Sequence, residues 1–299
     1  MRSLLRPLLA LSLLALPACS GSEGGSTPPP DADGESVETP AEEPAAVDPS
    51  LTGILDEAGF KALHELTGDA APAPKGETIA LAGSEAYLSL PEGAEPGAPL
   101  PAIVVVHEWW GLNDHIRHWT DRLAEDGYAA IAVDLYGGQV ATTPEEAMTL
   151  MKAVDKPVAA ALLSAAHDFL QQDPRINADK QGVIGWCFGG GWSLRHAIAT
   201  ADLDAAVIYY GHPEMDAEQL ARIEAPLLAV YANEDQSIPP EVVDAFAKAI
   251  EDAGKSMELH RYDANHAFAN PSSARYDETS ATDAWAKVRA FLSANLRGE

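Results

Sequence analysis

The residues around Cys187 could place a nucleophile at the end of a strand. The segment 185–189 reads G-W-C-F-G and lies between an apolar run and a predicted helix. Small residues on both sides let the chain turn sharply and push the central side chain outward, as at a nucleophile elbow. The positive end of the helix would favour a thiolate, and the Phe188 amide would be free to bind an oxyanion. The alternative is a buried structural cysteine in a glycine-rich turn.

Two later loops offer an acid and a base for this nucleophile. Asp235 follows the apolar run 226–233, and His266 follows the run 257–262. The order Cys187, Asp235, His266 suits acyl transfer, in which an imidazole moves protons and a carboxylate holds the imidazole in one tautomer. Glu234 competes with Asp235 for the acid's role, and a lone Asp in such a loop is often solvated or caps a helix.

The loop after the apolar run 102–107 could supply a second oxyanion donor. It reads H-E-W-W-G-L-N over 107–113, and the Trp109 amide is the candidate donor. Glu108 is unexpected beside a nucleophile, because its negative charge would disfavour a thiolate. The alternative is that Glu108 points to solvent or forms a salt bridge with a neighbour.

Composition and spacing exclude several other kinds of site. The chain has 19 Lys+Arg against 46 Asp+Glu, a net charge of −27, which disfavours a nucleic-acid partner. Two cysteines are too few for a disulfide framework or a Cys-rich metal site. The H-E-x-x-H zinc motif fails because residue 111 is Gly, and the pair His115 and His118 has no evident third ligand. We therefore expect no metal site.

The elements that would position these residues alternate between strand and helix. Strands are predicted at 78–81, 85–90, 102–107, 129–134, 181–186, 205–210, 226–233 and 257–262. Helices are predicted at 51–66, 113–126, 144–154, 157–172, 190–200, 239–253 and 282–296. This alternation indicates one α/β domain with a mostly parallel, doubly wound sheet, and in such a sheet the reactive residues gather at the carboxyl ends of the strands.

The N-terminal residues resemble an export signal followed by a disordered tether. Residues 1–19 have a basic start and a short apolar run, and they end at Cys19. A Cys after a small residue resembles a bacterial lipobox, so we expect lipidation of Cys19 and anchoring in the cell envelope; the alternative is an ordinary signal with an incidental Cys. Residues 20–50 hold eight acidic and no basic residues, which predicts a disordered tether. A short helical extension (51–75) and the main domain (76–299) follow.

Five motifs together resemble the dienelactone hydrolase family over roughly residues 77–296. They are H-E-W-W-G-L-N at 107–113, D-L-Y at 134–136, G-W-C-F-G-G at 185–190, Y-Y-G at 209–211 and H-A-F at 266–268. The resemblance implies an α/β-hydrolase fold and cofactor-free hydrolysis of an activated ester or lactone. It also implies a triad of Cys187, Asp235 and His266, an oxyanion hole of the Trp109 and Phe188 amides, and a Glu108 that interacts with the Cys and controls its ionisation.

Two arginines that bind a substrate carboxylate in the type enzyme are missing. Gly137 and Gly138 follow the D-L-Y motif, and Asn270 stands after the H-A-F motif, so a neutral substrate fits better than an anionic one. Arg275 could substitute from the same loop. The expected substrate pocket consists of Trp110, Tyr136, Trp186, Tyr210, Phe268 and Arg275.

The sequence therefore predicts a lipid-tethered hydrolase that cleaves a small ester or lactone through an acyl-enzyme on Cys187. We expect a monomer whose only membrane contact is the lipid anchor. One alternative is a catalytically degenerate, ligand-binding lipoprotein. Another is thiol chemistry such as redox sensing, although the folded domain has no second Cys to act as an intramolecular resolving partner.

Overall fold

The computed structural model describes residues 55–299 apart from 63, 65, 68–69 and 96. The predicted signal (1–19), the tether (20–50) and the lipidation site Cys19 lie outside the described residues. Within the described part, no helix is both long enough and apolar enough to cross a membrane.

Eight strands form one sheet in the order β1-β2-β4-β3-β5-β6-β7-β8. β2 is antiparallel to both of its neighbours, β1 and β4, and all other neighbouring strands are parallel. Every residue of β3 to β7 is buried, which explains the continuous apolar runs in the sequence. The strands are β1 (Glu77–Leu81), β2 (Ser84–Ser89), β3 (Ala102–Val106), β4 (Ala129–Val133), β5 (Gln181–Trp186), β6 (Ala205–Tyr209), β7 (Leu227–Ala232) and β8 (Met257–Tyr262).

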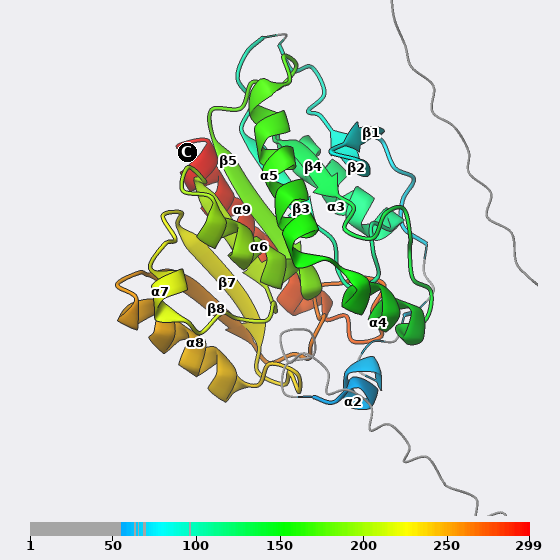
Figure 1. Cartoon of the computed structure of the whole chain (residues 1–299), viewed down its shortest axis with the longest axis vertical. Helices are drawn as coiled ribbons and strands as arrows, with labels where there is room; N and C mark the ends of the chain where they lie inside the picture. Colours follow the sequence, from blue (N-terminus) through cyan, green and yellow to red (C-terminus); the bar gives the residue numbers. More distant parts are fainter. Residues whose placement is uncertain (1–54, 63, 65, 68–69, 96) are drawn as a thin grey trace, which may run out of the picture. The chain divides into compact units, whose positions relative to one another are not determined.

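Helices cover both faces of this sheet (Figure 1). They are α2 (Glu57–Ala62), α3 (Asp114–Glu125), α4 (Pro144–Ala153), α5 (Lys156–Gln172), α6 (Phe188–Ala199), α7 (Ala217–Leu220), α8 (Pro240–Asp252) and α9 (Glu278–Leu296). On one face α5 and α6 are neighbours, with the rings of His167 and His196 5.9 Å apart. On the other face α3 meets α9, where Trp119 and Trp285 are 4.7 Å apart. The doubly wound α/β fold predicted from the sequence is confirmed.

Most element boundaries agree with the predictions within a few residues. The helix predicted over 51–66 is described only as α2, Glu57–Ala62. The short helix α7 was not predicted, because four residues are too few to show a helical period. Helix α9 begins at Glu278, four residues earlier than predicted, since the Asp277 side chain accepts a hydrogen bond from the Ser280 amide and caps it there.

The chain after α2 is attached to the loop that follows His266. The Thr67 amide donates to the Ser272 carbonyl at 2.8 Å, and Leu66 forms an isolated bridge with Ser273. We call residues 55–67 the N-terminal strap. These contacts hold the strap beside the carboxyl end of the sheet, so its side chains can reach the predicted active site.

The turn from β5 into α6 is as tight as the glycine pattern predicts. Cys187 has φ 53° and ψ −118°, a conformation that side chains other than glycine rarely adopt. A Cβ on Gly185 would lie 2.3 Å from the Gly189 carbonyl oxygen, and one on Gly189 would lie 2.3 Å from the Val106 oxygen. Glycine at these positions lets the helix start directly against the sheet, which is why α6 begins at Phe188 and not at residue 190.

This packing can be tested by two alanine substitutions on the same strand. Gly185→Ala should lower the free energy of unfolding by about 1–3 kcal/mol or more, because the added methyl meets backbone that cannot move aside. Gly182→Ala is the matched control, since its Cβ would meet a Leu296 methyl at 3.1 Å and the Ala205 oxygen at 3.3 Å. Urea denaturation measures both losses. If Gly185→Ala loses no more free energy of unfolding than Gly182→Ala, the role of the turn is contradicted.

Candidate active site

Cys187 lies at a point where backbone strain is concentrated. Its side chain is only 5% exposed. Among the described residues, five that are not glycine have positive φ, and three of them, Cys187, Tyr210 and Ala267, follow β5, β6 and β8 at this end of the sheet. Sparsely populated backbone conformations persist where the surrounding structure imposes them, and they cluster at functional sites.

Asp235 and His266 form a buried pair beside the sulfur. His266 Nδ1 donates to Asp235 Oδ2 at 2.6 Å, while Asp235 Oδ1 accepts from the amides of Ser237 at 2.7 Å and Ile238 at 3.0 Å. Burial by itself would raise the pKa of Asp235, but the His266 charge and these hydrogen bonds hold it below its usual value. The predicted acid is therefore Asp235 and not Glu234, whose Oε2 accepts from Asn265 Nδ2 at 3.0 Å.

His266 is placed to exchange a proton with Cys187. Its Nε2 is buried and makes no hydrogen bond to a described residue. Burial would lower the pKa of His266, but the charges of Asp235 and Cys187 outweigh it and raise the pKa well above its usual value. The potential ligand atoms of His64, Cys187 and His266 all lie within 4.8 Å of one another. The structure thus brings together the three residues that the sequence predicted as a triad.

His64 is a further residue at the sulfur that the sequence analysis missed. Its Nε2 lies 3.8 Å from Cys187 Sγ, and its Nδ1 lies 2.8 Å from the Phe60 carbonyl oxygen. Since a carbonyl only accepts, Nδ1 carries the proton, and Nε2 can accept from the thiol. Burial, with a smaller contribution from His266, lowers the pKa of His64 to about 3, so the ring is neutral. Nothing in the segment F-K-A-L-H marks this histidine, because only the folded strap brings it to residue 187.

Glu108 is buried and forms no salt bridge with a described residue, so the alternative that it points to solvent or pairs with a charged neighbour is wrong. Its Oε2 accepts a hydrogen bond from Asn270 Nδ2, and its Oε1 has no partner among the described residues. Burial raises the pKa of Glu108 to about 7, against the opposing effects of His266 and Asn270. Asn270, which stands where the family type has an arginine, therefore supports Glu108, and its own Oδ1 accepts from Ser272.

The two predicted oxyanion donors lie at the same end of the sheet. Phe188 is the first residue of α6, so its amide has no partner within the helix. Trp109 follows β3 and is fully buried, with its ring 4.2 Å from His64 and 5.2 Å from Phe60. The strap therefore packs directly on the loop that carries the second predicted donor.

The predicted substrate-pocket residues do not all surround one cavity. A cavity of about 20 Å³ beside Cys187 is lined by Tyr210, together with Phe60, Phe188 and His266. The other predicted residues are placed as follows: Trp110 packs on Trp109, Tyr136 lines a separate cavity, Trp186 stacks on Trp119 and Tyr209, Phe268 packs between Tyr210 and Tyr262, and Arg275 donates to Asn265. Trp186, the last residue of β5, and Phe268, in the loop after β8, are buried in the core.

Polar atoms without partners gather around the sulfur. Among the described residues, eleven buried side-chain nitrogen or oxygen atoms make no hydrogen bond. Five of them surround this site: Glu108 Oε1, Trp109 Nε1, Tyr136 OH, Tyr210 OH and His266 Nε2. A buried polar group left unpaired costs about 1–3 kcal/mol, so these atoms need partners, such as water or a ligand, that the described residues do not supply.

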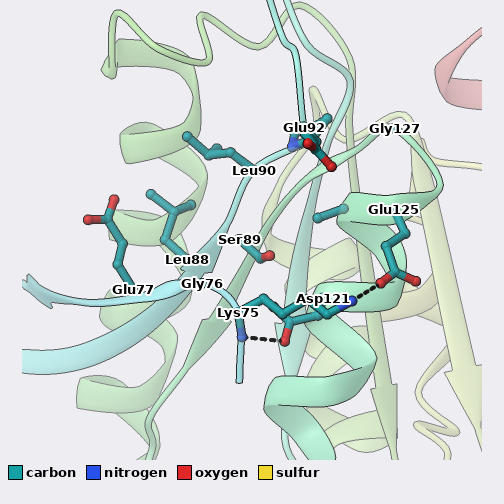
Figure 2. Close-up of a pocket in the computed structure, with 12 residues that line it drawn as sticks. Lys75, Gly76, Glu77, Leu88, Ser89, Leu90, Glu92, Asp121, Glu125 and Gly127 are labelled. Carbon is teal, nitrogen blue, oxygen red and sulfur yellow. Dashed lines mark hydrogen bonds and ion pairs between the residues drawn. The ribbon is translucent and has the colours of Figure 1, made fainter. Parts of the chain in front are cut away.

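A larger cavity, of about 690 Å³, lies between the β1–β2 edge and α3 (Figure 2). The Lys75 side chain pairs with Glu125 there, and the Lys75 amide donates to Asp121 Oδ2 at 2.9 Å. These charged groups already satisfy one another. No cysteine or histidine lines this cavity, so it offers no nucleophile and base like those around Cys187.

Comparison with known proteins supports the resemblance seen in the motifs. The family model described as "Dienelactone hydrolase family" matches residues 84–296. Protein usf of Aquifex pyrophilus is 33% identical over 221 residues, covering 70% of this chain and 93% of its own. A protein of Saccharolobus solfataricus, provisionally named a carboxymethylenebutenolidase, is 32% identical and covers 69% of this chain and 92% of its own.

Solved structures give the same result. A crystal structure assigned as a dienelactone hydrolase from Klebsiella pneumoniae has a TM-score of 0.63 and 30% identity, covering 74% of this chain and 99% of its own. A dienelactone-hydrolase-like promiscuous phosphotriesterase from metagenomic libraries has a TM-score of 0.65 and 26% identity, covering 75% and 99%. The matches agree with the tight turn at Cys187 and with the buried pair of Asp235 and His266. The chain therefore belongs to the dienelactone hydrolase family of α/β-hydrolases.

Proposed function

We propose that this protein hydrolyses a small neutral ester or lactone, with Cys187 as nucleophile, His266 as proton carrier and Asp235 as the acid that orients it. The observation that carries the proposal is the buried Asp235–His266 pair, with the free imidazole nitrogen beside a sulfur at a strained turn. Family membership supports the reaction class.

In the first half of the reaction the Cys187 thiolate attacks the ester carbonyl carbon, and the carbonyl electrons move onto the oxygen. The Phe188 and Trp109 amides would hold this oxyanion. When the tetrahedral intermediate collapses, the C–O bond breaks and the leaving alcohol takes its proton from the His266 imidazolium. A raised pKa of His266 suits this step, because the ring is then protonated while the thiolate is formed.

In the second half water attacks the thioester. His266, now neutral, removes a proton from the water, and the second tetrahedral intermediate releases the acid and regenerates the Cys187 sulfur. Asp235 keeps the Nδ1 proton throughout, which leaves Nε2 as the exchanging atom.

The buried Glu108 carboxyl is compatible with an anionic nucleophile because burial keeps it largely neutral. With a pKa of about 7, it carries little charge below neutral pH, so it does not oppose the thiolate there. As the pH rises above 7, Glu108 ionises beside the site, and its charge then disfavours a second anion. We propose that Glu108 influences the ionisation of Cys187 through this charge, while its carboxyl accepts a hydrogen bond from Asn270 Nδ2.

The proposed substrate class rests on two arginines that the chain lacks. The family-type arginines are absent, and Arg275 Nη1 donates to Asn265 Oδ1 at 3.0 Å. Arg195 and His212 do line the cavity beside Cys187, so the proposal of a neutral substrate rests on the two missing arginines alone. A cavity of about 20 Å³ holds no ester, so the side chains that line it, Phe60 of the strap among them, must shift when substrate enters.

We also propose that the protein is exported and anchored by lipid at Cys19. The basic start, the short apolar run and the cysteine after a small residue support this proposal.

The central prediction concerns the nucleophile. Cys187→Ala should reduce kcat for a neutral chromogenic ester such as p-nitrophenyl acetate by at least about 1000-fold, because the covalent route is lost. Mass spectrometry of the quenched wild-type protein should show an acetyl group on Cys187.

Cys19→Ala is the matched control, because it removes the chain's other cysteine and should leave turnover unchanged. Unaltered turnover by Cys187→Ala would exclude the mechanism. If no ester or lactone is processed, while a ligand raises the Tm, the protein is a degenerate ligand-binding member of the family.

The buried Glu108 carboxyl should make folding depend on pH. Its pKa is raised from 4.5 to about 7 by folding, so the unfolded chain ionises first and stability falls as the pH rises from about 4.5 to 7. Relative to Glu108→Gln, the wild type should lose up to about 3 kcal/mol across this window. Urea denaturation at pH 4.5, 6 and 8 measures the difference. A constant difference would show that Glu108 titrates normally.

The anchoring proposal is tested on the full chain in a bacterial host. The wild type should incorporate labelled palmitate and partition into the detergent phase of Triton X-114. Cys19→Ala should do neither, because acylation needs the sulfur. Equal labelling of both proteins would refute lipidation at this residue.

A further inference from the structure

A third potential metal ligand reaches the nucleophile from outside the family domain. His64 belongs to the N-terminal strap, whereas the family model matches residues 84–296. We propose that His64, Cys187 and His266 form a binding site for a thiophilic, tetrahedral divalent cation of the Zn²⁺ class, and that the bound ion blocks the nucleophile. The site shares Cys187 and His266 with the proposed hydrolysis but does not depend on that reaction.

The positions of the three side chains are close to those a zinc ion requires. Their potential ligand atoms lie within 4.8 Å of one another, and His64 Nε2 is 3.8 Å from Cys187 Sγ. Bond lengths of about 2.3 Å to sulfur and 2.0–2.1 Å to nitrogen, at tetrahedral angles, separate the donors by about 3.3–3.6 Å. Small side-chain movements would therefore bring all three atoms onto one ion.

Both histidines are already oriented by a second partner. His64 Nδ1 donates to the Phe60 carbonyl, and His266 Nδ1 donates to Asp235 Oδ2. A carbonyl or carboxylate on the far nitrogen is the usual arrangement for metal-bound histidine, because it fixes the tautomer and leaves the other nitrogen to bind. His266 Nε2 is buried and makes no other hydrogen bond to a described residue.

The surroundings suit an ion with one further ligand. All three residues are buried, and the adjoining cavity of about 20 Å³ has room for about one water. A thiolate and two neutral imidazoles leave one positive charge on a divalent ion, and the nearby carboxylate of Asp235 offsets it. Three protein ligands and one open position form a common zinc geometry.

Binding of the ion would stop acyl transfer. The thiol proton, and any proton on His266 Nε2, would pass to solvent, and the sulfur electron pair would be shared with the metal. The sulfur could then not attack a carbonyl, and His266 could not carry a proton. Removal of the ion by a chelator would restore both groups, so the block would be reversible.

Cobalt titration of the full chain, freed of metal by a chelator and without substrate, tests the site directly. Co²⁺ should produce a near-ultraviolet thiolate-to-metal charge-transfer band and the strong visible bands of tetrahedral coordination, and Zn²⁺ should abolish both. Cys187→Ser should lose the charge-transfer band. His64→Gln should weaken Co²⁺ binding by at least about 10-fold, because losing a ligand costs at least as much as losing a residue that orients one.

Two further variants complete the test. His260→Gln is the matched control, since this histidine lies on β8 and its Nε2 pairs with Glu258 at 2.6 Å, so Co²⁺ binding should be unchanged. His64→Cys should keep tetrahedral binding and increase the charge-transfer intensity, because a second thiolate joins the ion. If His64→Gln fails to fold, His64→Cys takes its place as the variant that tests position 64.

No charge-transfer band at saturating Co²⁺, or equal affinity of wild type and His64→Gln, would overturn the proposal. If the wild type gives the expected cobalt spectrum but turns over no ester, only the proposed hydrolysis is refuted. Conversely, ester turnover that excess Zn²⁺ does not reduce would refute the block, even if the esterase activity is confirmed.

Discussion

The close approach of backbone between β5 and α6 is the constraint on which the site depends. A Cβ on Gly185 or Gly189 would lie 2.3 Å from a carbonyl oxygen, so only glycine permits the helix to start against the sheet. The turn holds Cys187 in a strained conformation, with its carbonyl accepting from the Gly191 amide. The position of the sulfur and the start of α6 at Phe188, whose amide has no partner within the helix, follow from this packing.

Burial then sets the protonation states around the sulfur, with different results for similar groups. Asp235 stays ionised because three hydrogen bonds and an imidazolium compensate its burial, whereas Glu108, with one amide donor, is held largely neutral. The two histidines diverge for the same reason. His266 faces a carboxylate and its pKa rises, while His64 faces a backbone carbonyl and its pKa falls to about 3. One small site therefore holds carboxyl groups and imidazoles in both their charged and their neutral forms.

The N-terminal strap brings side chains to Cys187 from outside the residues that the family model matches. Phe60 and His64 pack on Trp109, and the strap is held to the loop after His266 through Thr67 and Ser272. Its side chains therefore contact both the nucleophile and the loop of the second predicted oxyanion donor. The strap supplies Phe60 to the wall of the narrow cavity beside Cys187 and His64 to the proposed cation site, and it lies before the residues that the family model matches.

The sequence by itself determined the fold class, the tight turn at Cys187 and the order of the three residues proposed as a triad. Apolar runs, glycine spacing and strand-end motifs are local patterns, and the parallel sheet necessarily brings its strand ends to one edge. The partner of Glu108, the inward packing of Trp186 and Phe268, and the arrival of His64 at the sulfur were decided only by the tertiary structure. Each depends on contacts between segments far apart in the chain, such as the 123 residues that separate His64 from Cys187. No local pattern encodes which side chain such a contact will select, because packing and burial choose it only after the sheet has formed.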